Sequence, residues 1–405
     1  MLIREYLRGN SSPWKAYLDV LPREFNTPMF WNEQDVAELQ ASSVVSKIGR
    51  AKADAMLRNK VVSVVRANEG VFFPKDGTAR LDDEELLALA HRMGSAIMAY
   101  AFDLDKEDND SDDEEEDGWV EDREGRSALG MVPMADMLNA DAEFNAHINH
   151  GEGNLTAVAL RLIQAGEEIF NYYGPLSNGE LLRRYGYVTE RHSRYDVVEL
   201  PWSLVEARLR TRLSGGQLSD AEWSKAAKLF AEEKEEEEEE DEEGEEESFV
   251  LERESGEPDA TGKFQGEAVF TGLPEELGER VKAFLKAVKK ATSGGANASV
   301  GESLSDKTVR KEIYLESVLG ALVDREAQYP TKLEDDEQQV GSLELTGRRH
   351  LAVCVRTGEK RLLREAQAWV RRELETIHAE SSSRPRDSRE RQGYEDAPSA
   401  KRRRT

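Results

Sequence analysis

The sequence contains one cysteine, Cys354, and only six histidines among its 405 residues. One cysteine excludes an internal disulfide framework and is typical of a reducing compartment. It also excludes a cysteine-rich zinc site within the chain, because such sites need several thiolate ligands. His147 and His150 stand three residues apart without a third ligand beside them in the sequence. We therefore predict that the protein has no metal site.

Long apolar runs are also missing. No stretch approaches the roughly 20 apolar residues that span a bilayer, so we expect neither a membrane segment nor a membrane partner. The first residues, MLIREYLRGNSSPWK, lack the apolar core of a secretory signal. Hydrophobic residues make up 38% of the chain and charged residues 34%, which indicates a soluble protein with polar tracts. The length is sufficient for two or three compact units.

The formal net charge of −27 is concentrated in two short tracts. Residues 103–124 contain 14 acidic and 2 basic side chains, and residues 232–247 contain 14 acidic and 1 basic, so only about −2 remains for the rest. Acidic runs of this density repel themselves, and we predict solvated insertions that stay disordered. Alternatively, the tracts attract a basic partner, such as a ribosomal protein or a histone, through long-range steering.

The last 25 residues have the opposite character. Residues 381–405 are rich in Ser, Arg and Pro, show no apolar periodicity and end in the cluster KRRR at residues 401–404. This composition predicts a disordered basic tail. A short basic cluster favours nuclear import or an electrostatic contact, so we expect the protein in the nucleus, with the cytoplasm as a second compartment.

Helical periodicity dominates both ends of the folded part. Residues 14–100 are expected to be mostly helical: the apolar positions of residues 35–60 come close to a helical stripe, and residues 82–100 form a second helix. Asp82 and Asp83 favour the start of that helix through its dipole. Further helices are expected at residues 202–213, 275–290, 306–329 and 343–377.

The middle of the chain has a different pattern of secondary structure. Between residues 127 and 200 the helices become short, glycines mark turns, and brief strands are expected at residues 155–162, 168–173 and 194–200. Two motifs stand about thirty residues apart here. The first is MVPMADMLNAD (residues 131–141), and the second is AGEEIFNYYGPLSNGELLRRYGYV (residues 165–188).

Together these motifs resemble the SET-domain protein-lysine methyltransferases, and within them the Rubisco large-subunit methyltransferase type. The resemblance rests on the turn at Asn139, the Tyr172-Tyr173-Gly174 loop and the Tyr185-Gly186-Tyr187 segment. It extends over most of residues 12–375, and its supporting stretches are residues 12–22 (SPWKAYLDVLP), 38–49, 97–102 (IMAYAF) and 319–338. It implies an α+β protein with a β-rich SET fold that contains a helical insert, followed by an all-α substrate-binding domain.

The resemblance also divides the chain into domains. Residues 1–90 would form the helical insert, and residues 91–200 the C-terminal half of the SET domain, interrupted by the acidic insertion at 103–124. Residues 201–260 would be a linker with the second acidic tract, residues 261–380 the helical substrate-binding domain, and residues 381–405 the tail. No Gly-X-Gly precedes Ser12, so the glycine-rich strand pair that opens the family's SET domain is expected to be absent.

For the active site, the resemblance implies a role for each matching residue. Tyr185 would be the catalytic tyrosine, with its hydroxyl near the methyl group that is transferred. Asn139 and the backbone of Ala140 would hold the cofactor, S-adenosyl-L-methionine, and Tyr195 would lie near its adenine. Most relatives have histidine where this chain has Ala140. Any contribution from a side chain at that position is therefore lost.

The lysine channel would be shaped by Asp136 and Tyr173, with Tyr100 and Phe102 at its entrance. Because Tyr172 and Tyr173 alternate along the chain, we expect Tyr173 to face the channel and Tyr172 the core. Plainer explanations are also open: Tyr185 as a core aromatic, Asn139 as a helix C-cap and Asp136 as a buried acceptor.

The implied function is S-adenosylmethionine-dependent methylation of a lysine in a ribosomal or nuclear, basic protein, by a monomer without a nucleic-acid partner. The alternative is a non-catalytic SET-derived binding protein that docks a basic partner through its helical domain and acidic tracts. A third possibility is methylation of a histidine, as some relatives of this branch perform.

Overall fold

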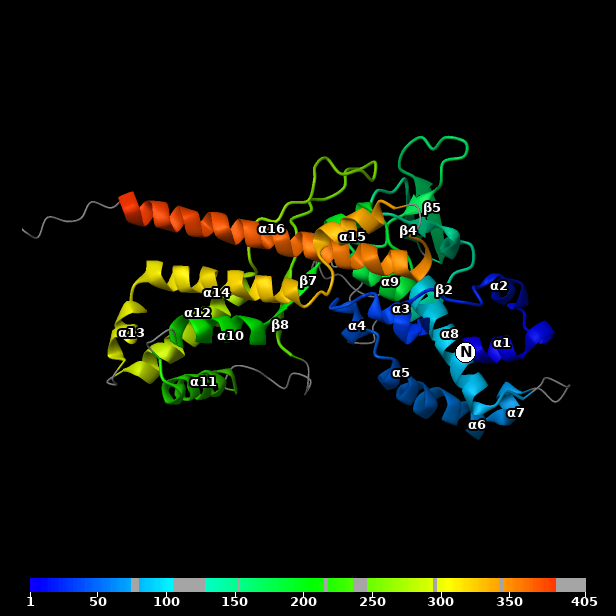
Figure 1. Cartoon of the computed structure of the whole chain (residues 1–405). Helices are drawn as coiled ribbons and strands as arrows, with labels where there is room; N and C mark the ends of the chain where they lie inside the picture. Colours follow the sequence, from blue (N-terminus) through cyan, green and yellow to red (C-terminus); the bar gives the residue numbers. More distant parts are fainter. Residues whose placement is uncertain are drawn as a thin grey trace, which may run out of the picture.

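The structure, a computed structural model, describes residues 1–73, 80–104, 128–151, 153–214, 218–235, 246–293, 297–342 and 345–383. A part with short helices and strands adjoins a bundle of longer helices, and the last helix extends along both (Figure 1). Most of the two acidic tracts and the tail from residue 384 lie outside the described residues. The predictions made for those segments therefore stay predictions.

Short helices dominate the first hundred residues, as the sequence predicts. They are α1 (Leu2–Leu7), α2 (Lys15–Val20), α3 (Glu33–Ala37), α4 (Val44–Lys47), α5 (Arg50–Leu57), α6 (Ser63–Ala67), α7 (Glu69–Phe72) and the longer α8 (Asp83–Tyr100). The stripe expected over residues 35–60 is divided among α3, α4 and α5. Gln40 (φ 57°) and Gly49 (φ 58°) adopt left-handed backbone conformations, which a right-handed helix cannot contain.

The helix expected at residues 82–100 is confirmed. Asp82 caps α8: its carboxylate accepts from the Glu85 backbone N–H, and the Glu85 carboxylate accepts from the Asp82 backbone N–H, both at 2.8 Å. This reciprocal capping box satisfies two of the backbone donors that every helix start leaves open. Asp82 therefore caps α8 directly, in addition to complementing the helix dipole.

The strands of the described residues form four separate pairs. β1 (Ala101–Leu104) pairs antiparallel with β2 (Ala128–Met131), and β4 (Ala146–Gly151) pairs antiparallel with β5 (Asn154–Ala159). β3 (Asn139–Ala140) runs parallel to β6 (Phe170–Asn171), and β7 (Val198–Pro201) is antiparallel to β8 (Ser248–Leu251). Asp103 and Leu104, the first two residues of the predicted acidic insertion, are paired in β1, and the rest of that insertion lies outside the described residues.

Two of the strand predictions need correction. The strand expected at residues 168–173 is reduced to Phe170–Asn171, and the strand expected at residues 194–200 starts only at Val198. Arg191–Tyr195 forms the 3-10 helix η5 instead, in which the Asp196 backbone N–H closes the last turn on the Ser193 carbonyl. The apolar alternation of these segments was too short to exclude a helical turn.

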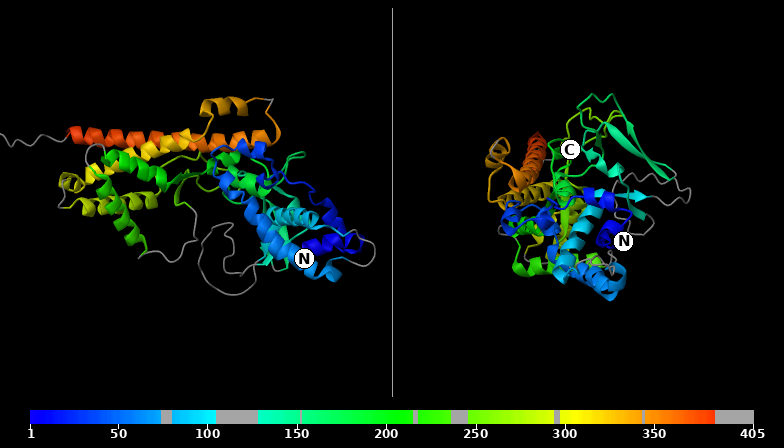
Figure 2. Two further views of the ribbon diagram at one scale, coloured as in Figure 1. Left: turned by 60° about the horizontal axis from the view of Figure 1, so that its bottom comes forward. Right: turned by 90° about the vertical axis from the view of Figure 1, so that its right-hand side faces the viewer.

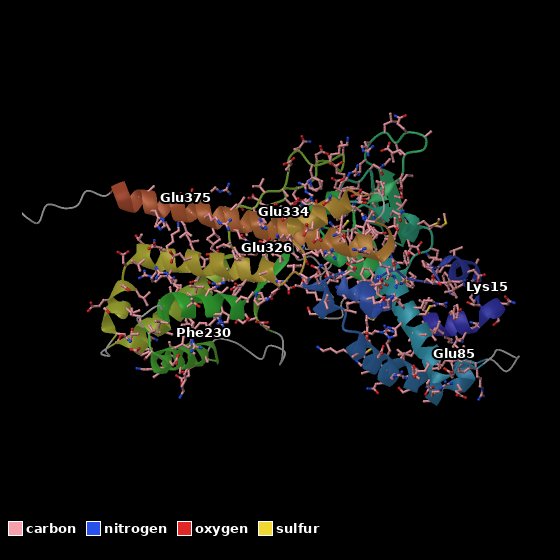
Figure 3. The ribbon with its side chains drawn as sticks, viewed as in Figure 1. Lys15, Glu85, Phe230, Glu326, Glu334 and Glu375 are labelled. Atoms are coloured by element: carbon pink, nitrogen blue, oxygen red, sulfur yellow. The ribbon has the colours of Figure 1, made fainter. Side chains whose placement is uncertain are left out.

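The helical part begins earlier than the sequence suggests. It contains α10 (Trp202–Ser214), α11 (Asp220–Glu235), α12 (Glu275–Thr292), α13 (Ala298–Ser303), α14 (Lys307–Ala327), α15 (Leu333–Val340) and α16 (Gly347–Ser383). Its core is a single cluster of buried residues, the first of which is Val198 and the last Ile377. In that core the ring of Phe284 meets Trp223 of α11 at 5.1 Å and Phe230, also of α11, at 5.2 Å; Phe230 is labelled in Figure 3.

The sequence led us to expect a linker at residues 201–260, but the described residues of this range pack in the helical core. They supply two helices and a strand to the helical core, and we propose that this domain starts near Val198. The acidic tract concealed the apolar side of α11, because its charges dominate the composition of the segment.

α16 is the longest helix and connects the two parts. It lies along the helical bundle and extends past it to the part with the short helices (Figures 1 and 2). Arg364 on α16 pairs with Glu326 of α14 and lies 3.8 Å from Glu334 of α15; both glutamates are labelled in Figure 3. Among the described residues, no helix combines the length and the apolar character needed to cross a membrane.

Buried polar groups fasten α16 to the N-terminal helices. Asp336 is fully buried and binds the side chains of Arg356 and Lys360, while Arg356 also binds the carbonyl and the carboxylate of Glu38. A buried charge that loses its partner is strongly destabilising. Satisfaction of these groups therefore requires one arrangement of the two parts.

A second buried carboxyl, Glu359, lies in the same interface. Its two oxygens accept from the hydroxyls of Ser42 (2.7 Å) and Tyr329 (2.8 Å). Burial raises the pKa of Glu359 to about 7, although both hydrogen bonds oppose the rise. The carboxyl is therefore neutral in the folded protein at mildly acidic pH.

This raised pKa predicts a pH-dependent effect of Glu359→Gln on stability. The stabilising contribution of a raised carboxyl pKa is complete below about pH 4.5 and is lost as the pH rises through about 7. Between pH 5 and pH 8, the free energy of unfolding of Glu359→Gln relative to the wild type should rise by on the order of 2 kcal/mol. Denaturant unfolding at several pH values measures this, and a difference that is independent of pH would contradict it.

Candidate active site

A cleft of about 910 Å³ lies where β1, β4, α9 (Asn178–Tyr185) and η5 meet. This volume is in the range of small-molecule and cofactor sites. Six aromatic side chains line it, and five of them are tyrosines. They are Tyr100, Phe102, Tyr172, Tyr173, Tyr185 and Tyr195. The structure thus brings both sequence motifs to one cleft.

Tyr185 is placed by the geometry of α9. Ser177 caps the start of the helix by accepting from the Glu180 N–H, and Gly186 ends it with φ 81°. A Cβ atom on Gly186 would lie 2.9 Å from the carbonyl carbon of Asn26, so the close approach of the two backbones requires glycine. Tyr185, the last residue of α9, is thereby held against the Tyr173 ring at 5.0 Å.

The hydroxyl of Tyr185 is buried and has no hydrogen-bond partner among the described residues. Burial raises the pKa of Tyr185 to about 12, Arg184 opposes this rise, and Glu180 adds to it. A buried hydroxyl without a partner costs about 1–3 kcal/mol. Because Tyr185 also lines the cleft, we interpret its hydroxyl as a group whose partner is a bound ligand.

Asp136 brings a carboxylate to this tyrosine cluster. It lies in the 3-10 helix η4 (Ala135–Met137), and its Oδ2 accepts from the Tyr17 hydroxyl of α2 at 2.5 Å. Burial is the main cause that raises the pKa of Tyr17 and of Tyr100, and the negative charge of Asp136 adds to the rise for both. Sequence reasoning missed Tyr17, because 119 residues separate the partners and no local pattern marks the contact.

Tyr172 and Tyr173 both line the cleft, so the expected division between a channel residue and a core residue is not observed. Tyr173 donates its hydroxyl to the Leu138 carbonyl at 2.8 Å. Tyr172 stacks on Phe144 at 4.8 Å, and its hydroxyl lies 3.3 Å from that of Tyr195. The alternation argument does not apply, because β6 ends at Asn171.

Asn139 and Ala140 lie beside the cleft and are absent from its wall. The Asn139 amide is exposed and donates to Glu168 Oε1 at 2.6 Å, while the buried Ala140 accepts at its carbonyl from the Tyr187 hydroxyl at 3.2 Å. Asn139 is a strand residue, so the helix C-cap explanation is wrong. The Tyr187 ring, 6.2 Å from that of Tyr185, connects this strand to the site.

The Phe102 ring, which also lines the cleft, lies 6.5 Å from the His150 ring. His147 and His150 line the cleft as well. Within the part of the chain that the structure describes, no three His, Cys, Asp or Glu side chains are grouped as metal ligands.

The segment after β8 supplies an acidic wall that the sequence did not reveal. Glu252, Glu254 and Glu257 all line the cleft. Arg194 secures the segment by donating to the hydroxyl (2.8 Å) and the carbonyl (2.6 Å) of Ser255. Arg194 and Ser255 are 61 residues apart in the sequence, so no local motif could indicate that this segment belongs to the site.

The fold and the site define an α+β protein with short SET-type strand pairs, a helical insert and a helical C-terminal domain, as the sequence predicts. The chain superposes on the SET domain of LSMT bound to lysine and AdoHcy with a TM-score of 0.60 and 18% identity, over 93% of this chain and 75% of that chain. Rubisco LSMT bound to AdoMet gives a TM-score of 0.54 at 19% identity, over 93% and 74% of the two chains.

Sequence comparisons point to the same family. Residues 283–363 match the Rubisco LSMT substrate-binding family model. Ribosomal lysine N-methyltransferase 4 of Saccharomyces cerevisiae is 35% identical over 206 residues, which cover 49% of this chain and 40% of that protein. Human N-lysine methyltransferase SETD6 is 32% identical over 189 residues, which cover 45% and 36%. The predicted resemblance to SET-domain lysine methyltransferases of the Rubisco LSMT type is therefore confirmed, over less than half the length of these relatives.

The environment of Tyr185 gives a prediction that needs no substrate. Its phenol should ionise near pH 12, well above the value of about 10 for a free tyrosine. The difference in phenolate absorbance between the wild type and Tyr185→Phe should therefore be negligible at pH 10.5 and appear only toward pH 12. A full one-tyrosine difference already at pH 10.5 would show that the hydroxyl is not buried as described.

Proposed function

We propose that the chain is an S-adenosylmethionine-dependent protein-lysine N-methyltransferase. The observation that carries this proposal is the buried, unpartnered hydroxyl of Tyr185 at an aromatic cleft. The names of the sequence relatives, which are lysine methyltransferases, support it, as do the lysine and AdoHcy bound in a protein of the same fold.

The residues of the cleft suit the cofactor. Bound S-adenosylmethionine would supply an electrophilic methyl group on a sulfonium centre. Tyr185 and Tyr195 both belong to the cleft wall, and Tyr195 offers an aromatic ring next to Phe264 (6.1 Å). We assign Tyr195 to the adenine. Asn139 and the backbone of Ala140 lie beside the cleft, so we assign them to polar groups of the cofactor that extend past its wall. The Tyr187 hydroxyl, bound to the Ala140 carbonyl, would hold that strand beside Tyr185.

The tyrosines prepare the lysine for methylation. A free lysine has a pKa of about 10.4 and is mostly protonated at neutral pH. Aromatic walls exclude water and thereby favour the neutral amine, which alone can attack the methyl group. The Tyr185 hydroxyl orients that amine, and Tyr173, held by its bond to the Leu138 carbonyl, keeps the Tyr185 ring in place. Fixed alignment of amine and methyl supplies much of the rate.

Asp136, Tyr100 and Phe102 would form the entrance of the lysine channel. The Asp136 carboxylate, fixed by Tyr17, attracts an incoming ammonium group. Tyr100 and Phe102 stand at the junction of α8 and β1, where the helix gives way to an extended strand. Their rings are rigid and cover the aliphatic part of a lysine at little loss of conformational entropy.

The acidic wall indicates the chemistry of the substrate. Glu252, Glu254 and Glu257 add three carboxylates to the cleft, and the exposed wall would attract Lys or Arg residues that flank the target lysine. We propose that the substrate is a basic ribosomal or nuclear protein, and that the enzyme acts on it as a monomer. The basic cluster at residues 401–404 supports a nuclear location.

Replacement of the catalytic tyrosine tests the proposed reaction. Tyr185→Phe should lower the rate of radiolabelled methyl transfer to a lysate by about 100-fold, because one positioned hydrogen-bonding group is lost from the reacting centre. Tyr6→Phe is the matched control, since Tyr6 lies on α1 and is exposed. Equal labelling by the wild type and Tyr185→Phe would contradict the assignment, and the amino acid that carries the label distinguishes lysine from histidine.

The acidic wall gives a separate prediction. Changing Glu252, Glu254 and Glu257 together to Gln should raise KM for a basic peptide about three- to tenfold, because exposed ion pairs of this kind contribute about 0.2–0.5 kcal/mol each. The effect should fade at high salt, and kcat should change little.

The control for this variant is the change of Glu275, Glu279 and Glu302 to Gln, which removes the same charge outside the cleft. If both triple variants raise KM equally, net charge rather than the acidic wall attracts the substrate.

A further inference from the structure

A glycine in the middle of the longest helix marks an unusually close contact. Gly358 lies within α16, where glycine is about 1 kcal/mol less favourable than alanine. A Cβ atom at this position would overlap Asp196 Oδ2 and lie 2.8 Å from Asp196 Cγ. The absence of a side chain therefore allows α16 to pack directly on the Asp196 carboxyl.

Asp196 connects this contact to the helix that carries Tyr185. Its side chain is buried, with 3% of the residue exposed, and Oδ1 accepts at 3.0 Å from the backbone N–H of Asn178, the first residue of α9. Oδ2, which faces Gly358, has no hydrogen-bond partner among the described residues. The carboxyl thus fills the space between α16 and the start of α9.

Two further contacts hold the same surfaces together. Leu182 of α9 packs with Ala352 and Val355 of α16 in one buried cluster. Arg253, at the end of β8, donates to the Ser193 carbonyl at 2.9 Å and pairs with Glu365 of α16. Glu365 stands seven residues after Gly358 and so lies on the same side of the helix. α16 therefore contacts both α9 and the segment that contains Asp196.

The far end of α9 is equally constrained. Gly186 fits against the backbone of Asn26, and the Asn26 amide donates to the Gly186 carbonyl at 3.4 Å. Between these two ends α9 is a helix of eight residues, too short to bend appreciably. A displacement at Asn178 would therefore tilt the whole helix about its Gly186 end and change the direction in which the Tyr185 side chain points.

We infer that Gly358 and Asp196 are positioning residues, through which the helical domain sets the place of the Tyr185 hydroxyl. This inference rests on the proposed function, in which Tyr185 is the catalytic tyrosine. The helical domain then has a role in addition to any contact with substrate: it controls how well the tyrosine is aligned for methyl transfer.

The test compares Gly358→Ala with Gly278→Ala. The added methyl group of the second variant meets only the Tyr314 hydroxyl, at 3.8 Å, and therefore serves as the control for a helical Gly→Ala change. Full-length proteins labelled with 3-fluorotyrosine are examined by 19F NMR, with the Tyr185 resonance assigned by Tyr185→Phe. Gly358→Ala should shift that resonance and lower kcat about tenfold, with KM changed less than about twofold. Gly278→Ala should leave the resonance and kcat unchanged.

Substitutions at Asp196, alone and combined with Gly358→Ala, form a double-mutant cycle with that variant. Asp196→Ala removes the atoms that the new methyl group would overlap, since Asp196 Cβ lies 3.5 Å away. In that background, Gly358→Ala should have little further effect on the resonance or on kcat. Asp196→Asn keeps an acceptor for the Asn178 N–H and should retain more activity than Asp196→Ala. This ordering tests the inference even if Gly358→Ala does not fold.

The outcomes separate the two proposals. A folded Gly358→Ala with an unshifted Tyr185 resonance and wild-type kcat overturns the positioning role, as do equal activities of Asp196→Asn and Asp196→Ala. A shifted resonance in a protein whose wild type transfers no methyl group supports the positioning of Tyr185 and overturns only the proposed function.

Discussion

The placement of α9 is the constraint on which the rest of the site depends. This short helix is fixed at its start by Ser177 and Asp196 and at its end by Gly186, whose backbone contacts Asn26. Between these points its buried side packs on α16. These contacts hold Tyr185, at the last turn of α9, in the wall of the cleft, where its buried hydroxyl has no partner among the described residues.

Buried polar contacts as well as apolar ones hold the two parts of the chain together. Asp336, Arg356 and Lys360 are buried and mutually paired, and Arg325 donates to the carbonyls of Ala41 and Glu199. Directional bonds of this kind tolerate little sliding, whereas an apolar interface of similar size would accept several registers. The helical part is thus docked in one orientation, which is what an active site shared between both parts needs.

Sequence reasoning was most successful where a pattern repeats locally. The helix at residues 82–100 and the long helices of the C-terminal part follow from apolar stripes, and the two motifs at residues 131–188 identified the family. It failed where charge obscured such a stripe, as in α11, and where one residue in a left-handed conformation divided it, as at Gln40. Propensity alone does not indicate which residue will adopt φ above zero.

The site was only partly predictable for a related reason. The motifs contain Tyr173 and Tyr185, but other parts of the site depend on contacts with distant segments. Tyr17 binds Asp136, residues 252–257 complete the cleft wall, and Gly358 packs on Asp196. None of these contacts leaves a periodic trace in the sequence, because each joins a single residue to another across the fold. Asn139, chosen from the motif alone, lies beside the cleft rather than in its wall.

The central claim is that the aromatic cleft at Tyr185 receives a lysine side chain for methylation. A crystal structure with S-adenosylhomocysteine and a lysine-containing basic peptide tests it most directly. The account predicts that the lysine Nζ lies within about 3.2 Å of the Tyr185 hydroxyl, between the rings of Tyr173 and Tyr100. A lysine bound elsewhere, with the Tyr185 hydroxyl still lacking a partner, would contradict it.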